Sequence, residues 1–433
     1  MNSFSSVQHS LADTRHATQN CRFCAAELRH TFADLGTSPL CQSIIRHDQL
    51  QDMEPSYPLH AYVCHNCFLV QLQEFVAPQN IFSEYAYFSS YSSSWVEHAR
   101  RYTDMAAERF GLGPDSKVME IASNDGYLLQ HFLAKGIPVL GIDPAANVAA
   151  AAALKGIPTE VRFLGSASAE IIAGMHGQAD LLLGNNVLAH VPDLNDFVAG
   201  MKRLLAPNGV ITMEFPHLRQ LMKGNQFDTI YHEHFSYFSF LAVEKIFASQ
   251  GLTLFDVEEL PTHGGSLRIY VRHAGNAQLA VGDRVHAMLR TEVEEGFLSL
   301  DHYRGFSEQV KSTKRKLLAF LIDAKERGKR IVGYGAPGKG NTLLNYCGIR
   351  TDFLDFTVDA NPYKQNTYTP GTRIPILPPD SIRDARPDYV LILPWNLRDE
   401  ISHAAAFIAE WGGQFVVPIP EVEVFRAPEL MAV

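Results

Sequence analysis

The sequence predicts an α/β protein in three parts, a small cysteine-containing unit followed by two segments in which strands and helices alternate. Three observations support this prediction. Two Cys-x-x-Cys pairs stand before residue 70, a strand and helix pattern begins at Lys117, and a comparable pattern begins again at Arg330. With 433 residues, of which 46% are hydrophobic, the chain can form about two to four domains with buried cores.

The composition of the chain argues against some classes of binding partner. The chain has 37 Lys and Arg against 47 Asp and Glu, a net charge of -10, so no overall positive field attracts nucleic acid or anionic lipid. Residues 1–20 are polar, and no apolar run approaches the ~18 residues that a membrane helix needs. We therefore expect a cytoplasmic protein without nucleic-acid or membrane partners, as a monomer or a weak homo-oligomer.

Four of the six cysteines form two tight pairs, Cys21 with Cys24 and Cys64 with Cys67. Two such knuckles supply the four thiolates of a closed tetrahedral shell, which is typical of structural zinc. Ordinary reduced thiols or a redox pair are the alternative, but no thioredoxin-like helix follows either pair. Zinc binding contributes on the order of 10 kcal/mol to folding, so residues 1–75 can form a domain despite a thin core.

Aromatic and hydroxyl side chains gather at residues 85–95, ahead of a predicted helix over residues 96–110. Such a cluster suits contacts with a polar ring of a ligand. A serine-rich helix start in which the tyrosines only pack is the alternative, and composition alone favours it.

From Lys117 onward, four predicted strands alternate with helical sequence, at residues 118–122, 139–142, 180–184 and 209–214. This alternation predicts a parallel sheet with right-handed crossovers and a ligand above its carboxyl edge. The first strand runs into a turn at residues 123–126 and a helix over residues 127–134. The second strand ends at Asp143, about 20 residues after that turn, where an α/β sheet binds the hydroxyls of a ribose.

The first turn differs from a dinucleotide-binding turn because it lacks the G-x-G-x-x-G pattern. A pyrophosphate needs bare backbone at a helix amino terminus, and Glu120 and Asp125 would repel it. Carboxylates in this place favour a cationic nucleoside instead.

Residues 120–126, Asp143, the pair Asn185 and Asn186, and residues 190–193 together resemble the cofactor motifs of class I S-adenosylmethionine-dependent methyltransferases. The resemblance implies a Rossmann-like core that binds S-adenosylmethionine. It also implies a set of cofactor-binding residues, namely Glu120, Ala122, Asn124, Asp125, Gly126, Asp143, Asn185 and Asn186.

Residues 231–239 are the densest polar and aromatic stretch in the chain. A His-x-His pair here could be half of a metal site, but no further ligands stand at a convincing spacing. With the zinc knuckles, the methyltransferase motifs and a carboxyl-terminal α/β segment, this stretch resembles the sugar C-methyltransferases. That family methylates carbon 3 of nucleotide-diphosphate 4-keto-deoxysugars, and the likeness covers nearly the whole chain, from residue 21 to residue 419.

The family resemblance also implies residue roles. It makes His234 the catalytic base and adds further residues of the reaction centre, namely Tyr231, Glu233, His190 and Tyr87. Tyr85 and Tyr237 are expected at the substrate. The residue types fit the chemistry, because a carbon beside a ketone becomes nucleophilic only when a base with a pKa near the working pH removes its proton. Charge then builds on the ketone oxygen and needs hydrogen-bond donors.

A second glycine pattern stands in the carboxyl-terminal segment, after a predicted basic helix over residues 311–327. Gly333, Gly335 and Gly338 form G-x-G-x-x-G between a strand and a helix, and Asp359 ends the next strand about 20 residues later. Alone, this pattern predicts a nicotinamide dinucleotide site and an oxidoreductase. No second catalytic set accompanies it, however, and residues 359–365, 370–372 and 394–396 resemble the sugar methyltransferases, whose carboxyl-terminal domain binds no nicotinamide there.

We therefore expect Gly335 and Lys339 to face the diphosphate of the substrate, since helix amino termini favour phosphate. Glycines that only let a strand and a helix pack are the alternative. The predicted domains are a zinc unit at residues 1–75, a methyltransferase core at 76–256 and a Rossmann-like domain at 257–433. An N- or O-methyltransferase on a related sugar and a non-catalytic binding module are the other hypotheses, and the polar set at His190 and residues 231–237 argues against the module.

Overall fold

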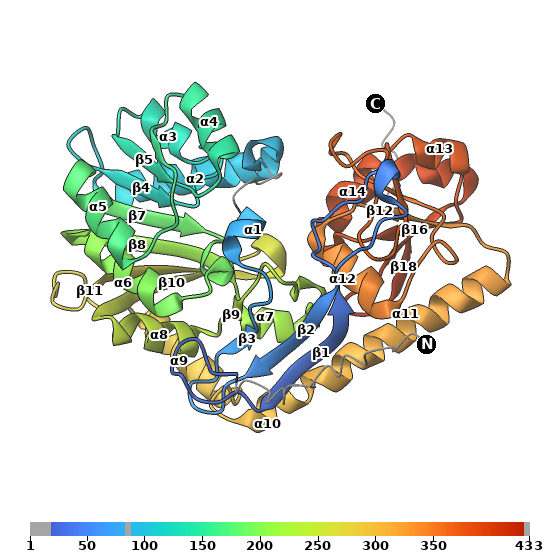
Figure 1. The fold of residues 1–433 in the computed structure, drawn as a ribbon, viewed down its shortest axis with the longest axis horizontal. Helices are drawn as coiled ribbons and strands as arrows, with labels where there is room; N and C mark the ends of the chain where they lie inside the picture. The colour runs from blue at the N-terminus through green and yellow to red at the C-terminus, as the bar shows by residue number, and fades with distance from the viewer. Residues whose placement is uncertain (1–18, 83–87, 428–433) are drawn as a thin grey trace, which may run out of the picture.

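The computed structural model describes residues 19–82 and 88–427, which form three β-sheets with flanking helices. Figure 1 shows two lobes, with the methyltransferase-like segment on the left and the carboxyl-terminal segment on the right. The strands β1 and β2 of the cysteine-containing unit lie between them, at the bottom of the view. The described part of the chain contains no helix that is both long and apolar enough to cross a membrane.

The first sheet is antiparallel and has the order β1-β2-β3-β9. Its strands are β1 (His30–Ser38), β2 (Tyr57–Val63), β3 (Val70–Leu72) and β9 (Ser236–Tyr237). The strand β9 comes from the middle of the chain, where Ser236 pairs with Gln71 and Tyr237 with Val70. The short helix α1 (Pro78–Phe82) follows this unit.

The second sheet has seven strands in the order β10-β11-β8-β7-β4-β5-β6. All pairings from β6 to β8 are parallel, as expected, and the fully buried strands β4 and β5 lie within this parallel part. The strands are β4 (Val118–Ile121), β5 (Val139–Ile142), β6 (Thr159–Glu160), β7 (Ala179–Asn185), β8 (Leu205–Pro216), β10 (Leu252–Leu260) and β11 (Ser266–His273).

Helices pack against this sheet. The first begins at the cap Ser92, whose Oγ accepts a hydrogen bond from the backbone N–H of Trp95, and it ends at the left-handed Gly111. It confirms the helix expected at residues 96–110. The helices of this lobe are α2 (Ser93–Phe110), α3 (Leu129–Ala134), α4 (Ala146–Leu154), α5 (Ser166–His176), α6 (Leu194–Leu204), α7 (Leu218–Lys223) and α8 (Phe240–Ser249).

The predicted domain boundary between residues 256 and 257 falls inside β10. Strand β10 pairs with β11, and β11 pairs antiparallel with β8, so this hairpin extends the second sheet to His273. This hairpin satisfies the backbone hydrogen bonds that β8 would otherwise leave open at the sheet edge, so the predicted boundary lies within a continuous sheet.

The third sheet has the order β14-β15-β13-β12-β16-β17-β18, with antiparallel strands at both edges and parallel strands between them. Its strands are β12 (Ile331–Tyr334), β13 (Thr357–Val358), β14 (Thr367–Tyr368), β15 (Pro375–Leu377), β16 (Tyr389–Ile392), β17 (Gln414–Val417) and β18 (Glu423–Arg426). Its helices are α12 (Gly338–Cys347), α13 (Ser381–Ala385) and α14 (Arg398–Ala404).

Three helices connect the lobes: α9 (Asp283–Glu294), α10 (Leu300–Arg304) and α11 (Phe306–Glu326). The long α11 runs along the lower edge of the right lobe in Figure 1 and packs on β1, where the rings of Phe32 and Phe306 stack with 4.5 Å between their centroids. One buried apolar cluster contains residues of β1, β2, α11 and α12. The cysteine-containing unit is thus packed into the body of the protein.

Candidate active site

The four knuckle cysteines come together. Their Sγ atoms all lie within 4.8 Å of one another, and the pairs Cys21–Cys67 and Cys24–Cys64 are each 3.5 Å apart. Zinc with Zn–S bonds of about 2.3 Å needs sulfur atoms roughly 3.8 Å apart, so the cluster fits a structural zinc ion. The side-chain amide of Gln71 donates to Sγ of Cys21 at 3.1 Å, which orients that ligand.

In the turn after β4, every second residue has a left-handed backbone conformation. Ala122, Asn124 and Gly126 all adopt positive φ values, of 54°, 51° and 75°. Only a glycine fits at the third position, because a Cβ on Gly126 would lie 2.3 Å from Cδ1 of Ile157. The turn thus keeps the backbone path of a glycine-rich loop with alanine and asparagine in place of two of the glycines.

Asp143 ends β5 and fixes this turn. Its Oδ2 accepts a hydrogen bond from the backbone N–H of Asn124, and its Oδ1 accepts one from that of Ala145, both at 2.9 Å. Burial raises the pKa of Asp143, while these two hydrogen bonds act in the opposite direction. The side chain lines the main cavity.

A cavity of about 530 Å³ lies above the carboxyl edge of the second sheet. Residues from all three parts of the chain line it. The sequence-predicted residues among them are Ala122, Asn124, Asp143, Asn185, Asn186, His190, Tyr231, Glu233, His234 and Lys339. Residues of the predicted cofactor turn and of the predicted reaction centre therefore line one cavity.

Several buried polar atoms near this cavity have no hydrogen-bond partner among the described residues. They include both carboxylate oxygens of Glu120, Nδ2 of Asn185 and Oδ1 of Asn186. Such atoms normally require a partner when buried. A ligand with an ammonium group, hydroxyls and a positive charge, such as S-adenosylmethionine, fits this set of acceptors and donors.

Three predicted cofactor residues lie beside the cavity rather than on its wall: Glu120, Asp125 and Gly126. Glu120 is fully buried, and this burial, with Asp143 and Asp125 nearby, raises its pKa well above the usual range. Oδ2 of Asp125 accepts a hydrogen bond from Lys155 at 3.1 Å.

His234 has a defined tautomer. Its Nδ1 lies 3.0 Å from the carbonyl oxygen of Thr229, which can only accept, so Nδ1 carries the proton and Nε2 keeps its lone pair. Burial, followed by the proximity of His190, lowers the pKa of His234 well below its usual value. The imidazole is therefore neutral near pH 7 and can accept a proton at Nε2.

Other rings surround His234. The rings of Tyr231 and His190 have centroids 4.1 and 4.8 Å from it, and that of Tyr237 lies at 6.1 Å. Tyr237 packs beside His234 without lining the cavity. Burial lowers the pKa of His190 to about 4, so this ring is neutral too.

Glu233 lies beside the histidines as a buried carboxyl group. Burial raises its pKa to about 7, and the Cys41 thiol donates to its Oε1 across 3.6 Å. Glu233 therefore carries a proton over part of the neutral range and can donate a hydrogen bond into the cavity.

Backbone hydrogen bonds fix the two histidine-bearing loops together. The N–H of Phe235 donates to the carbonyl oxygen of Ala189 at 2.7 Å. The carbonyl oxygen of Phe235 accepts from the N–H of Leu72 at 3.0 Å, which continues the pairing of β9 with β3. The cysteine-containing unit thus supports the wall that carries the histidines.

The carboxyl-terminal lobe contributes Lys339 to the cavity. Its Nζ donates to Oδ1 of Asn396 at 2.7 Å and lies 4.5 Å from the ring centroid of Trp395. The indole N–H of Trp395 donates to Asp228 at 2.8 Å. A buried polar cluster thus orients the ammonium group toward the cavity.

The glycine turn is only partly covered, because Gly338 lines the main cavity. A Cβ on Gly335 would lie 2.6 Å from Pro394, and a Cβ on Gly338 would lie 3.0 Å from Sγ of Cys41. Gly335 is not among the residues that line the main cavity. These contacts support the alternative in which the glycines allow close packing.

A larger cavity of about 1250 Å³ adjoins the first, and the two share Trp95, His263, Pro337 and Lys339. Sequence patterns did not identify His263 as a site residue. Its backbone is left-handed, with φ of 54°, and its Nε2 accepts from Nδ2 of Asn186 at 3.0 Å. The shared residues form a neck between the cavities.

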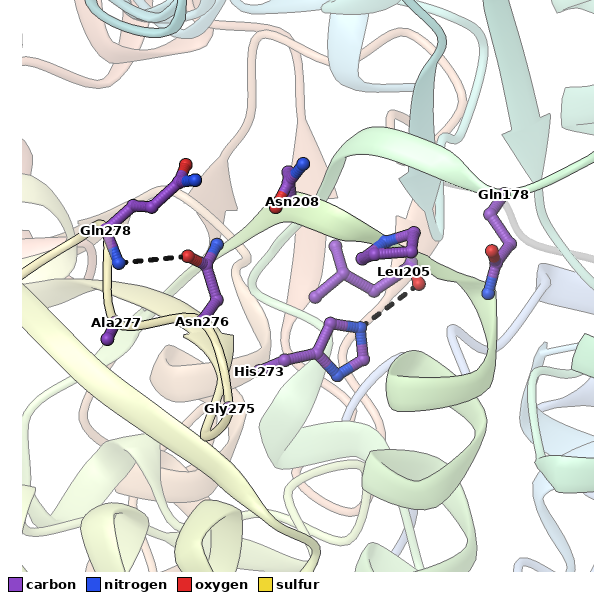
Figure 2. Close-up of a pocket in the computed structure, with 9 residues that line it drawn as sticks. Gln178, Leu205, Asn208, His273, Gly275, Asn276, Ala277 and Gln278 are labelled. Atoms are coloured by element: carbon purple, nitrogen blue, oxygen red, sulfur yellow. Dashed lines mark hydrogen bonds between the residues drawn. The ribbon is translucent and has the colours of Figure 1, made fainter.

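Figure 2 shows a different hollow, at the end of the second sheet where β8 begins and β11 ends. Its one histidine, His273, makes a 3.2 Å hydrogen bond to the carbonyl oxygen of Leu205. This hollow has no paired titratable groups and lies away from the carboxyl edge of the parallel strands. The main cavity is therefore the candidate active site.

Two predicted site residues, Tyr87 of the reaction centre and Tyr85 at the substrate, lie outside the described residues. The described neighbours on either side, Phe82 and Ser89, line the main cavity.

Comparisons with known proteins agree with these features. A zinc binding domain model matches residues 21–82, a methyltransferase domain model residues 95–257, and a C-methyltransferase C-terminal domain model residues 261–420. The chain is 36% identical over 417 residues to C-methyltransferase NovU from Streptomyces niveus, which covers 96% of this chain and 99% of NovU.

Solved structures with some likeness include two S-adenosylmethionine-dependent methyltransferases. The one from Anabaena variabilis has 16% identity and a TM-score of 0.33, over 40% of this chain and 83% of that chain. The one from Clostridium acetobutylicum has 13% identity and a TM-score of 0.34, over 42% of this chain and 92% of that chain. From the family models and the likeness to NovU, the chain belongs to the S-adenosylmethionine-dependent C-methyltransferases with an amino-terminal zinc-binding domain.

Proposed function

We propose that this C-methyltransferase transfers a methyl group to carbon 3 of a nucleotide-diphosphate 4-keto-deoxysugar. One observation carries the proposal, the neutral His234 with a free Nε2 in the same cavity as the cofactor turn. Methylation of oxygen or nitrogen needs less help from a base, whereas a carbon beside a ketone must lose a proton first.

S-adenosylmethionine, when bound, supplies an electrophilic methyl group on a sulfonium. The turn residues Ala122 and Asn124, with Asp143, Asn185 and Asn186, would hold it, and Asp143 would face the ribose. The unpaired oxygens of Glu120, buried beside the cavity, can accept hydrogen bonds from its ammonium or hydroxyl groups. These residues exclude water from the site and fix the donor relative to His234.

In the proposed reaction, Nε2 of His234 removes the proton from carbon 3. The negative charge that develops moves to the ketone oxygen, where donors from Tyr231, protonated Glu233 and His190 stabilise it. Such a donor is typically worth about 3 kcal/mol of transition-state stabilisation. Tyr87, and with it Tyr85, belongs to the proposal on the family resemblance alone.

The nucleotide part of the substrate needs space beyond the main cavity. A pocket of about 300–1,000 Å³ typically accommodates one drug-sized ligand, and the cofactor occupies one such volume. The adjoining cavity begins at the neck of Trp95, His263 and Lys339, so the ammonium of Lys339 can bind the diphosphate between the sugar and the nucleoside. The cationic residues Arg101, Arg219, Arg268 and Arg284 outnumber the acidic Glu258 and Glu259 along this cavity.

The test is incubation with a panel of nucleotide-diphosphate 4-keto sugars and S-adenosylmethionine labelled with ¹³C in its methyl group. A methyl signal bonded to carbon, with a mass gain of one methyl, is the expected result. A label on nitrogen or oxygen, or no transfer to any keto sugar, contradicts the proposal. In D₂O without the cofactor, wild-type protein should also exchange the proton on carbon 3, and H234Q should not.

A further inference from the structure

Arg22 connects the zinc knuckle to the reaction centre. In sequence it lies between the predicted zinc ligands Cys21 and Cys24, but its guanidinium group points away from the knuckle. Its Nη1 donates to the carbonyl oxygen of Pro192 at 2.7 Å, and its Nη2 donates to that of Leu72. The same group lies over the ring of Phe235, 5.4 Å from its centroid.

Each contact reaches one of the segments that hold the catalytic histidines. Pro192 lies two residues after His190, and Phe235 directly follows His234. Leu72 ends β3, the strand on which β9 pairs. One planar group therefore bridges both histidine loops and the sheet that supports them.

The other end of Arg22 is fixed to the metal site. Its backbone N–H donates to Oε1 of Gln71 at 2.9 Å, and Nε2 of Gln71 donates to Sγ of Cys21 at 3.1 Å. Placing a guanidinium among two carbonyls and an aromatic ring is expensive, and its Nε has no partner among the described residues. An apolar side chain could fill the same space, so stability alone does not account for the choice of arginine.

We infer that Arg22 is a positioning residue. It is anchored at the zinc knuckle and from there sets the distance between His190 and His234. The fork of a guanidinium donates in two fixed directions at once, which a lysine cannot do. The inference rests on the proposed role of His234 as the base. A misplacement of about 1 Å at a reacting group can cost roughly a hundredfold in rate, so a support at this distance can control catalysis.

The experiment compares Arg22→Met with Arg29→Met in full-length, zinc-loaded protein. Arg29 is an exposed residue of the same unit that pairs with Glu27, so its loss is the matched control. The first measurement is the NMR signals of histidine labelled at ¹³Cε1, with His190 and His234 assigned from H190Q and H234Q. Zinc content, S-adenosylmethionine affinity and kcat are measured on the same samples.

We expect R22M to retain zinc and cofactor affinity, to shift the signals of His190 and His234, and to lower kcat by about tenfold to a hundredfold. R29M should change none of these. Unchanged histidine signals and unchanged kcat in zinc-loaded R22M would overturn the inference.

If R22M loses zinc or does not fold, Arg22→Lys decides by the same signals, because lysine retains the charge but only one of the two hydrogen bonds. Shifted signals in R22K support the inference, and wild-type signals overturn it. The histidine signals need no substrate, so they separate this inference from the proposed function. Shifts in R22M together with a wild-type protein that methylates no keto sugar would refute the proposed function only.

Discussion

The ring of His190 stands nearly edge-on to the ring of His234, with 4.8 Å between their centroids and 75° between their planes. The ring of His234 is buried and that of His190 is half-buried, and desolvation is the largest cause of the lowered pKa of each. Two positive charges at this distance would repel each other strongly, so the pair is neutral in the resting site. A neutral pair can combine a proton acceptor with a hydrogen-bond donor.

His234→Gln should lower kcat by about a hundredfold to ten-thousandfold, because general base catalysis contributes about that much. S-adenosylmethionine affinity, measured by calorimetry, should stay unchanged. His273→Gln, at the hollow in Figure 2, is the matched control and should leave both quantities as in the wild type. A kcat within tenfold of the wild type at unchanged affinity would exclude His234 as the base.

The pH profile of kcat/KM should be bell-shaped. On the acidic side, activity rises as His234 loses its proton, at a pH below the usual histidine pKa of about 6.5 because burial lowers that pKa. On the alkaline side, activity falls as Glu233 loses its donor proton, since burial raises its pKa to about 7.

Glu233→Gln separates the two limbs of that profile. The glutamine amide donates a hydrogen bond at every pH, so the alkaline limb near pH 7 should disappear while the acidic limb stays. A profile of E233Q that still falls near pH 7 would assign that limb to another group.

Asp143→Asn should weaken S-adenosylmethionine binding by about ten- to a hundredfold, as expected for the loss of charge-assisted hydrogen bonds. The amide also places a donor against one of the N–H groups of Asn124 and Ala145, which disturbs the turn. Calorimetry with the cofactor measures this effect, and the exposed Glu170→Gln is its control. Equal affinities of D143N and wild type would remove Asp143 from the cofactor site.

Lys339→Met should raise KM for the nucleotide sugar by about tenfold while cofactor affinity stays constant. The reason is that a contact between a half-buried ammonium group and a phosphate is worth roughly 1.4 kcal/mol, which corresponds to a factor of ten. The half-buried Arg398→Met, which pairs with Glu423, serves for comparison. A fall in kcat at constant KM would instead indicate that Lys339 acts on the reacting sugar.

Removal of zinc should inactivate the enzyme as well as lower its melting temperature. Wild-type protein should contain one zinc per chain, and a chelator under reducing conditions should abolish methyl transfer, since β3 and Arg22 support the histidine loops. Metal analysis and thermal unfolding measure this, and restored activity on adding zinc is the control. Full activity in metal-free protein would contradict the expected support of the histidine loops by the zinc-binding unit.

Local sequence patterns predicted much of this site. The spacing of Cys21, Cys24, Cys64 and Cys67 indicated one cluster, because each knuckle is local and the chemistry of thiolates requires four. Asp143 was found because the carboxyl ends of neighbouring parallel strands meet at one edge. The rule for Asp143 acts within about 25 residues of the chain, and the rule for the cysteines joins two short local motifs by their shared chemistry.

Contacts between distant segments could not be read in the same way. Cys41 meets Glu233 across 192 positions, and Asn186 meets His263 across 77. Neither pair has a spacing rule, since only the packing of whole domains brings them together. The pairing of β11 with β8 was missed for a related reason, because it depends on an open sheet edge rather than on the sequence of β11 itself.

The pairing of β9 with β3 limits how this enzyme can be divided. The middle segment carries His234, the proposed base, but among the described residues its two-residue strand β9 pairs with β3 of the amino-terminal unit. A chimaera in which only the middle segment is exchanged therefore pairs β9, and the loop that carries His234, with a β3 strand from another protein. The cysteine-containing unit and the middle segment therefore have to be exchanged together, in evolution as in engineering.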